Sequence, residues 1–164
     1  MKVSEEYIVD KVIKFLADKK DGNWHIDKSK RSKLHGPGAD IIMVGGTKNG
    51  ERFIIECKGN SDARSANSIN TSVWINALGE LITRMNVNRF VKKKGSNALY
   101  TINRAYKYGI GLYWRGAKVA LRRIPKAIAQ TLNLYIFAVN DKGKVIPFTP
   151  SQCGKEYPDS LFNR

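Results

Sequence analysis

The spacing of hydrophobic positions in the first third of the chain predicts one helix followed by two strands. Residues 4–19, SEEYIVDKVIKFLADK, place apolar side chains at helical spacing behind Ser4, a residue type that caps helix N-termini. The runs ADIIMVGG (39–46) and ERFIIECKG (51–59) are short, rich in β-branched residues and bounded by turn residues, which is typical of strands. Asn49-Gly50 lies between them and favours a tight hairpin, so we expect the two strands to pair antiparallel.

The rest of the chain continues this alternation. A short strand is expected in DGNWHID (21–27), and loops are expected in 28–38, 59–71 and, as an irregular basic stretch, 86–105. Residues 72–85 predict a helix capped by Thr71 or Ser72, with one apolar face: Trp74, Ala77, Leu78, Leu81, Ile82 and Met85. Beyond it we expect a buried strand (106–114), a helix (117–132) disturbed at Pro125, a further strand (133–140) and an edge strand (144–148).

The predicted order is therefore α, β, β, β, α, β, α, β, with one more strand near the end. Neither internal repeats nor a linker interrupt it, so we expect a single domain over 1–164. Helices that alternate with the later strands indicate an α/β protein with a mixed sheet flanked by helices on both faces.

The charge balance of the chain says more about its function than the rest of its composition does. The chain has 29 Lys and Arg residues against 14 Asp and Glu, a formal net charge of +15, which favours a polyanionic partner such as nucleic acid. Cys57 and Cys153 are far apart and lack a CxxC neighbour, which argues against a zinc site or a disulfide scaffold. We see no secretory signal and no membrane-spanning run, so we expect a cytoplasmic protein that does not contact a membrane.

The candidate chemistry lies in the predicted hairpin. Glu56 and Lys58 are two residues apart in a strand, so their side chains share one face. Antiparallel pairing would bring Asp40, at the start of the preceding strand, next to Glu56. Two adjacent carboxylates repel each other unless a cation lies between them, and Mg²⁺, with Mn²⁺ as a substitute, suits such a pair. A neighbouring lysine can orient a water and stabilise charge on phosphate, so this set of residues suits phosphodiester hydrolysis.

Glu5 is a fourth candidate. At 100° per residue it points close to the direction of the apolar stripe of the first helix, whereas Glu6 points about 100° away. Two interpretations stay open: Glu5 is a partner of the helix dipole, or it is a further carboxylate of the site.

The helix followed by GAD and IIECKG resembles the PD-(D/E)XK nuclease superfamily, whose fold is restriction-endonuclease-like. The motif aspartate is Asp40 and the E-x-K is Glu56-Cys57-Lys58, while Pro37 stands three residues before Asp40 instead of directly before it. The details are similar to archaeal-type Holliday junction resolvases and Mrr-like endonucleases. The resemblance implies an αβββαβ core and a metal-dependent DNA endonuclease. Asp40, Glu56 and the backbone carbonyl of Cys57 would hold Mg²⁺, Lys58 would assist the attacking water, and Glu5 would join the site.

Basic residues on both sides of the motif are candidate phosphate contacts: Lys28, Lys30, Arg31, Lys33, Arg89, Lys92, Lys93 and Lys94. For any one of them a solvated loop is the simpler interpretation. His25 and His35 have no partner at ligand spacing, and Glu80 is assigned to the surface because its helix turns it away from Trp74 and Leu81.

The function classes stay open at this point. A metal-dependent DNA endonuclease comes first, acting as a homodimer if two strands are cut. The alternative is a non-catalytic basic nucleic-acid-binding protein in which the acid pair is incidental. RNA as the substrate ranks lower, because the chain has no RNP-type aromatic motif.

Overall fold

The computed structural model describes residues 3–18, 24–27, 39–45, 51–60, 66–85, 90–91, 101–102 and 106–163. The first half contains α1 (Glu5–Ala17), β1 (Trp24–Ile26), β2 (Ile41–Gly45), β3 (Glu51–Lys58), α2 (Ala66–Arg84), β4 (Phe90–Val91) and β5 (Thr101–Ile102). The second half contains β6 (Tyr106–Tyr113), α3 (Trp114–Arg123), α4 (Lys126–Leu132), β7 (Leu134–Val139), β8 (Val145–Phe148) and the 3-10 turns η4 (Pro150–Gln152) and η5 (Asp159–Leu161).

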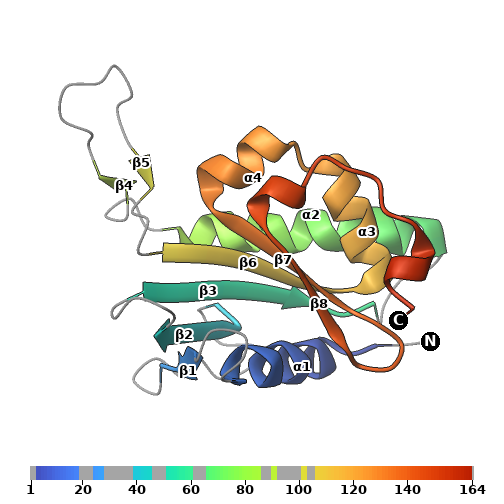
Figure 1. Ribbon diagram of the computed structural model, residues 1–164, viewed down its shortest axis with the longest axis horizontal. Helices are drawn as coiled ribbons and strands as arrows, with labels where there is room; N and C mark the ends of the chain where they lie inside the picture. Colours follow the sequence, from blue (N-terminus) through green and yellow to red (C-terminus); the bar gives the residue numbers. More distant parts are fainter. Residues whose placement is uncertain are drawn as a thin grey trace.

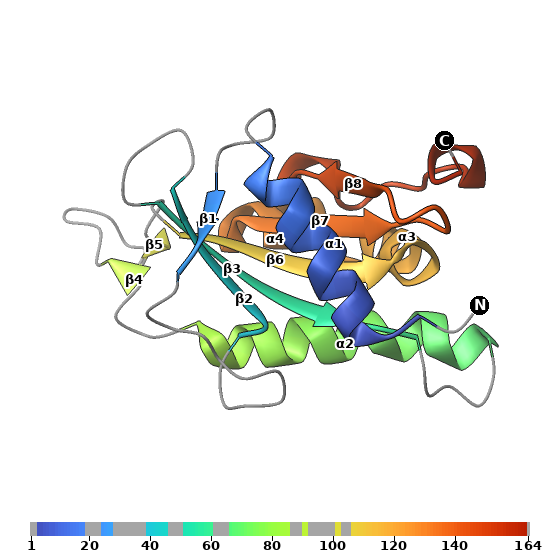
Figure 2. The same cartoon turned by 90° about the horizontal axis from the view of Figure 1, so that it is seen from below.

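Six strands form one curled mixed sheet in the order β1-β2-β3-β6-β7-β8. The strands β1, β2 and β3 pair antiparallel, β6 is parallel to both β3 and β7, and β8 closes the far edge antiparallel to β7. Helices α2, α3 and α4 cover one face of the sheet and α1 crosses the other (Figures 1 and 2). The predicted α/β class, mixed sheet and helices on both faces are confirmed, as are the β2–β3 hairpin and the edge position of β8.

The face under α1 depends on a close approach between helix and sheet. A Cβ atom at Gly111 in β6 would lie 2.6 Å from Cys57 Sγ and 3.3 Å from the side chains of Ile8 and Val12. Glycine at this position therefore allows α1 to pack directly on β3 and β6. Buried side chains from both faces form a continuous hydrophobic core.

Two details differ from the sequence expectation. Helix α2 begins at Ala66, inside the stretch expected to be a loop and before the expected caps Thr71 and Ser72. Differences in helix propensity among such polar residues are only tenths of a kcal/mol, so a helix fixed by packing farther along extends through them. The stretch expected to be irregular contains the short pair β4–β5, and two-residue strands are too short to have a recognisable period.

The break at Pro125 is as expected. Helix α3 ends at Arg123 and α4 begins at Lys126, and Pro125 takes the N-cap position of α4 with extended backbone. Proline has no amide hydrogen for an internal helix bond, which explains why the helix divides here.

Candidate active site

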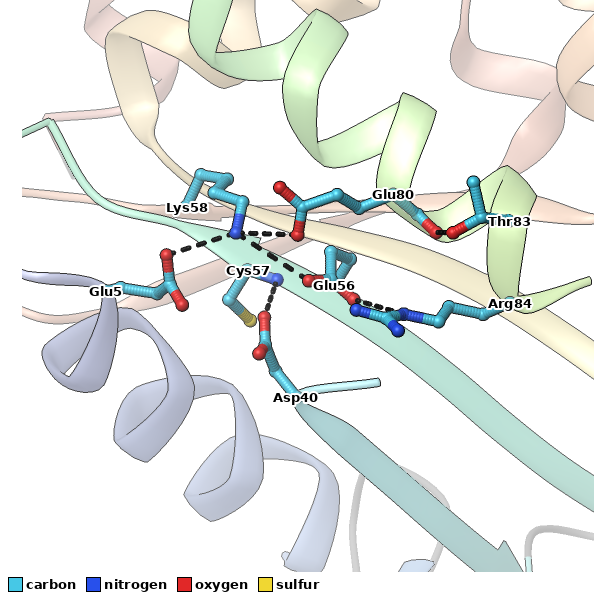
Figure 3. A network of polar contacts seen from close by, with 8 residues as sticks. All are labelled: Glu5, Asp40, Glu56, Cys57, Lys58, Glu80, Thr83 and Arg84. Atoms are coloured by element: carbon cyan, nitrogen blue, oxygen red, sulfur yellow. Dashed lines mark hydrogen bonds and ion pairs between the residues drawn. The ribbon is translucent and has the colours of Figure 1, made fainter. Parts of the chain in front are cut away.

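Glu56 and Lys58 project from the end of β3 toward α2 (Figure 3). The Glu56 residue is 1 % exposed, and the side chain of Lys58 is 20 % exposed. Lys58 Nζ lies 3.7 Å from Glu56 Oε1. Cys57 points to the opposite face, toward α1, as the alternation of side chains in a strand requires.

Asp40 immediately precedes β2 and is fixed to β3. The register pairs Ile41 with Ile55, so Asp40 lies next to Glu56 at the same end of the hairpin. Its Oδ2 accepts a hydrogen bond of 2.7 Å from the backbone N–H of Cys57. The sequence prediction that folding brings Asp40 beside the end of β3 is therefore confirmed.

Glu5 reaches the same place from the start of α1. The Ser4 hydroxyl caps the helix by accepting from the Tyr7 amide, and Glu5 Oε2 lies 3.3 Å from Lys58 Nζ. Of the two interpretations that the sequence left open, the placement of Glu5 agrees with a carboxylate of the site.

The backbone at the end of β3 holds α1 in this position. Val3 N donates to Asn60 Oδ1 at 2.6 Å, and Asn60 N donates to Val3 O at 2.8 Å. A Cβ atom on Gly59 would lie 2.4 Å from Val3 O and 2.6 Å from Glu5 N. Only glycine allows the chain before α1 to cross so close to β3.

Glu80 lies at the surface as expected, with its side chain 43 % exposed, but leaving it out of the site was wrong. Glu80 Oε2 lies 2.9 Å from Lys58 Nζ, the shortest of the three carboxylate contacts of this lysine, and Arg84 Nε, one turn farther along α2, lies 3.8 Å from Glu56 Oε2. The two side chains join the site from the helix above it (Figure 3).

A different choice of buried face for α2 would have placed Glu80 and Arg84 at the site. Among the residues of α2 whose burial is described, 72–84, Ala77 and Leu81 are fully buried, and Glu80 and Arg84 follow Ala77 at i+3 and i+7. The predicted face lies too far round the helix, because it includes Ile82, which is 50 % exposed.

The site carries more negative charge than its cations neutralise. Burial, a hydrogen bond with Glu80 and the charge of Asp40 raise the pKa of Glu56 to about 8, against the opposing effect of Lys58. Burial alone would lower the pKa of Lys58, but its hydrogen bond to Glu80 and the charges of Glu5 and Glu80 outweigh that effect and raise it. Glu56 therefore holds a proton at neutral pH while Lys58 stays charged.

The pKa of Glu80 moves in the opposite direction. Burial would raise it, yet hydrogen bonds with Glu56 and Lys58 outweigh burial and lower the pKa of Glu80. Burial, followed by the charges of Asp40 and Glu56, raises the pKa of the Cys57 thiol, so this cysteine stays protonated.

Three of the carboxylates, those of Glu5, Glu56 and Glu80, lie within 4 Å of the ammonium of Lys58. In the part of the chain that the structure describes, no group of three or more His, Cys, Asp and Glu side chains is arranged to hold a metal ion. Glu56 Oε2 is buried and accepts no hydrogen bond from the described residues.

The predicted phosphate contacts lie outside the described residues. These are Lys28, Lys30, Arg31, Lys33, Arg89, Lys92, Lys93 and Lys94, and His35, Asn49 and Gly50 also lie outside them. His25 is an exposed residue of β1.

Comparison with protein families, with curated proteins and with solved structures gives no match to this chain. None of the helices in the described ranges has both the length and the apolar content that a membrane-spanning helix needs.

Proposed function

We propose that this protein is a Mg²⁺-dependent DNA endonuclease of the PD-(D/E)XK type. The observation that carries the proposal is the convergence of Asp40, Glu56 and Lys58 with Glu5 at the end of one strand. The order of helices and strands from α1 through β3, α2 and β6 is compatible with the αβββαβ core that the sequence motif implies, apart from the small β4–β5 pair. If Asp40 and Glu56 were an incidental acid pair on a basic protein, the presence of two further carboxylates beside them, Glu5 and Glu80, would be unexplained.

The residues present suit a divalent cation. Glu56 is buried with an oxygen that accepts no hydrogen bond from the described residues, and it faces two other carboxylates. Burying carboxylates together is unfavourable without a compensating cation, and oxygen ligands are those that Mg²⁺ prefers. Asp40, Glu56 and the carbonyl of Cys57 would hold the ion. When bound, the ion would supply Lewis-acid activation of water and charge neutralisation at the phosphate.

The protein's own groups would have separate tasks. The Lys58 ammonium can donate hydrogen bonds to the attacking water and to a phosphate oxygen, which stabilises the charge that develops there. Glu5 and Glu80 hold the Lys58 ammonium from opposite sides. The Cys57 amide fixes the carboxylate of Asp40 in its orientation.

DNA as the substrate is supported by the net charge of +15, because phosphate contacts dominate the affinity of basic proteins for nucleic acids. If the enzyme cuts both strands of a duplex or resolves a junction, it would act as a homodimer, since two cuts need two sites.

The experiment incubates the protein with supercoiled plasmid and with a synthetic four-way junction in Mg²⁺, Mn²⁺ or EDTA. Wild type should cut only with metal, and Glu56→Gln should bind DNA without cutting it. Glu6→Gln is the matched control, because Glu6 is exposed beside Glu5 in the same helical turn. If Glu56→Gln cuts at the wild-type rate, the carboxylate site is not the active site; if wild type binds DNA and never cuts, the protein is a nucleic-acid-binding protein and not a nuclease.

A further inference from the structure

A second charged region lies along α3, outside the carboxylate site. A cavity of about 330 Å³ lies between α3 and the C-terminal segment, with Trp114 and Val119 in its wall. Three of its cations come from one side of α3 at positions i, i+3 and i+7, and two acids come from the C-terminal segment. These charged residues are Arg115, Lys118, Arg122, Glu156 and Asp159.

The two acids cover two of the three cations. Asp159 pairs with Lys118, and Glu156 Oε1 lies 3.6 Å from Arg122 Nη1. Arg115 lies over the ring of Trp114 at 5.2 Å and has no acidic partner among the described residues. This cavity, the α3 groove, therefore has more positive than negative charge even in the free protein.

These ion pairs are easily replaced. The side chains of Glu156 and Asp159 are 71 % and 60 % exposed, and exposed pairs contribute little because water and salt screen them. The backbone that carries Glu156 and Asp159 is held in place by other contacts. Phe162 is fully buried, and its ring stacks on that of Trp114 with the ring centroids 5.6 Å apart. The Phe162 carbonyl accepts a hydrogen bond from Asn140 Nδ2. Only two exposed side chains need to turn away to uncover the cations.

The wall of the cavity begins near the same end of the central strands as the carboxylate site. Lys58 at the end of β3 is paired in register with Leu112 of β6, and Trp114 begins α3 two residues later. Adjacent strands are about 5 Å apart, so a long polyanion at Lys58 passes within reach of α3. Arginine forks match phosphate geometry better than they match a single distant carboxylate oxygen.

We propose that the α3 groove binds the backbone phosphates of duplex DNA, and that Glu156 and Asp159 occupy the phosphate positions in the free protein and yield them on binding. This inference rests on the proposed function for its ligand, but it concerns binding and not cleavage.

The test measures binding of a fluorescent DNA duplex by anisotropy in EDTA, at several salt concentrations. The variant Arg115→Ala/Lys118→Ala/Arg122→Ala should bind at least about tenfold more weakly, with a salt slope reduced by about 2–3, because each phosphate contact contributes about 0.9 to the slope. The matched control Lys14→Ala/Lys142→Ala/Lys144→Ala removes three cations elsewhere and should have a smaller effect on both quantities.

A second variant tests the role of the acids. Glu156→Gln/Asp159→Asn should tighten binding severalfold, and more than Asp10→Asn/Asp18→Asn, which changes net charge equally on α1 and at its C-cap. Thermal unfolding checks that each variant is folded.

Equal losses in the two cation variants, or no tightening beyond the acidic control, would overturn the inference. In either case plasmid cutting by wild type would leave the proposed function intact. Absence of any DNA binding by wild type would count against both.

Discussion

Glu5 and Lys58 are 53 residues apart in the chain, approach each other from opposite faces of the sheet, and place their charged atoms 3.3 Å apart (Figure 3). Glu80 reaches the same ammonium from α2 on the other face. Lys58 therefore links both helical layers to the end of β3. The position of the Lys58 ammonium therefore depends on how both helical layers pack on the sheet.

Gly59 is the position on which this meeting depends. Gly59→Ala would place a methyl group 2.4 Å from a backbone oxygen that cannot turn aside, so it should lower the free energy of unfolding by about 1–3 kcal/mol. It should also move Glu5 away from Lys58 and reduce metal-dependent cutting. Urea unfolding and the plasmid assay measure these effects.

Gly79→Ala provides the matched control. Gly79 lies in the interior of α2 with nothing within 4 Å of an added Cβ, so alanine there should stabilise the protein by up to about 1 kcal/mol. If both alanine variants shift stability in the same direction, the close approach at Gly59 is not the cause.

The second prediction concerns Glu80. Glu80→Gln keeps a hydrogen-bond acceptor near Lys58 Nζ but removes the charge that makes the shortest of its carboxylate contacts. We expect kcat on a DNA substrate to fall about tenfold with little change in KM, because the variant loses orientation of Lys58 and not DNA contacts.

Asp10→Asn removes a carboxylate of α1 that pairs only with exposed Lys14 among the described residues, and it should leave kcat unchanged. A rise in KM with kcat unchanged in Glu80→Gln would instead make Glu80 a DNA contact.

The sequence predicts the fold better than it predicts the site. Strands β2, β3 and β6 are short β-branched runs bounded by turns, and their period is visible without tertiary information. Asp40 and Glu56 follow from the hairpin alone, because antiparallel pairing fixes which ends meet. These contacts are local in sequence.

Glu80 and Arg84 depend instead on how α2 rotates on the sheet. Hydrophobic spacing alone leaves that rotation uncertain by about one residue, or 100°, and this is enough to move Glu80 from the site to the surface. The hydrogen bonding between Val3 and Asn60, which holds the start of α1 at the end of β3, leaves no periodic pattern in the sequence. The contact between Glu5 and Lys58 could therefore be seen only in the structure.

The third prediction concerns pH. The pKa of Glu56 is about 8 in the folded protein and near 4.5 in the unfolded chain. The proton on Glu56 therefore stabilises the fold fully below about pH 4.5, and this contribution is lost as pH rises toward 8. The lowered pKa of Glu80 acts with the opposite sign, but its contribution is lost only as pH falls below about 4.5, so it does not alter the trend between pH 5 and pH 8.5.

In EDTA, wild type should lose on the order of 1–3 kcal/mol between pH 5 and pH 8.5 relative to Glu56→Gln, which cannot ionise there. Urea unfolding of both proteins across this range gives the difference directly. If the difference stays constant with pH, Glu56 does not hold a proton in the folded state.

The last prediction separates the two roles of Lys58. Its ammonium lies among Glu5, Glu56 and Glu80, so a divalent cation and Lys58 compete for the same negative charge. Lys58→Met keeps most of the side-chain volume and removes the charge. We expect it to abolish cutting, since the donor to water and phosphate is lost, while Mg²⁺ binds about tenfold more tightly because the competing cation is gone. Isothermal titration with Mg²⁺ measures the affinity, and Lys14→Met, which removes an exposed charge on α1, should leave it near that of wild type. Weaker Mg²⁺ binding in Lys58→Met would mean that the lysine holds the carboxylates in place for the ion instead of competing with it.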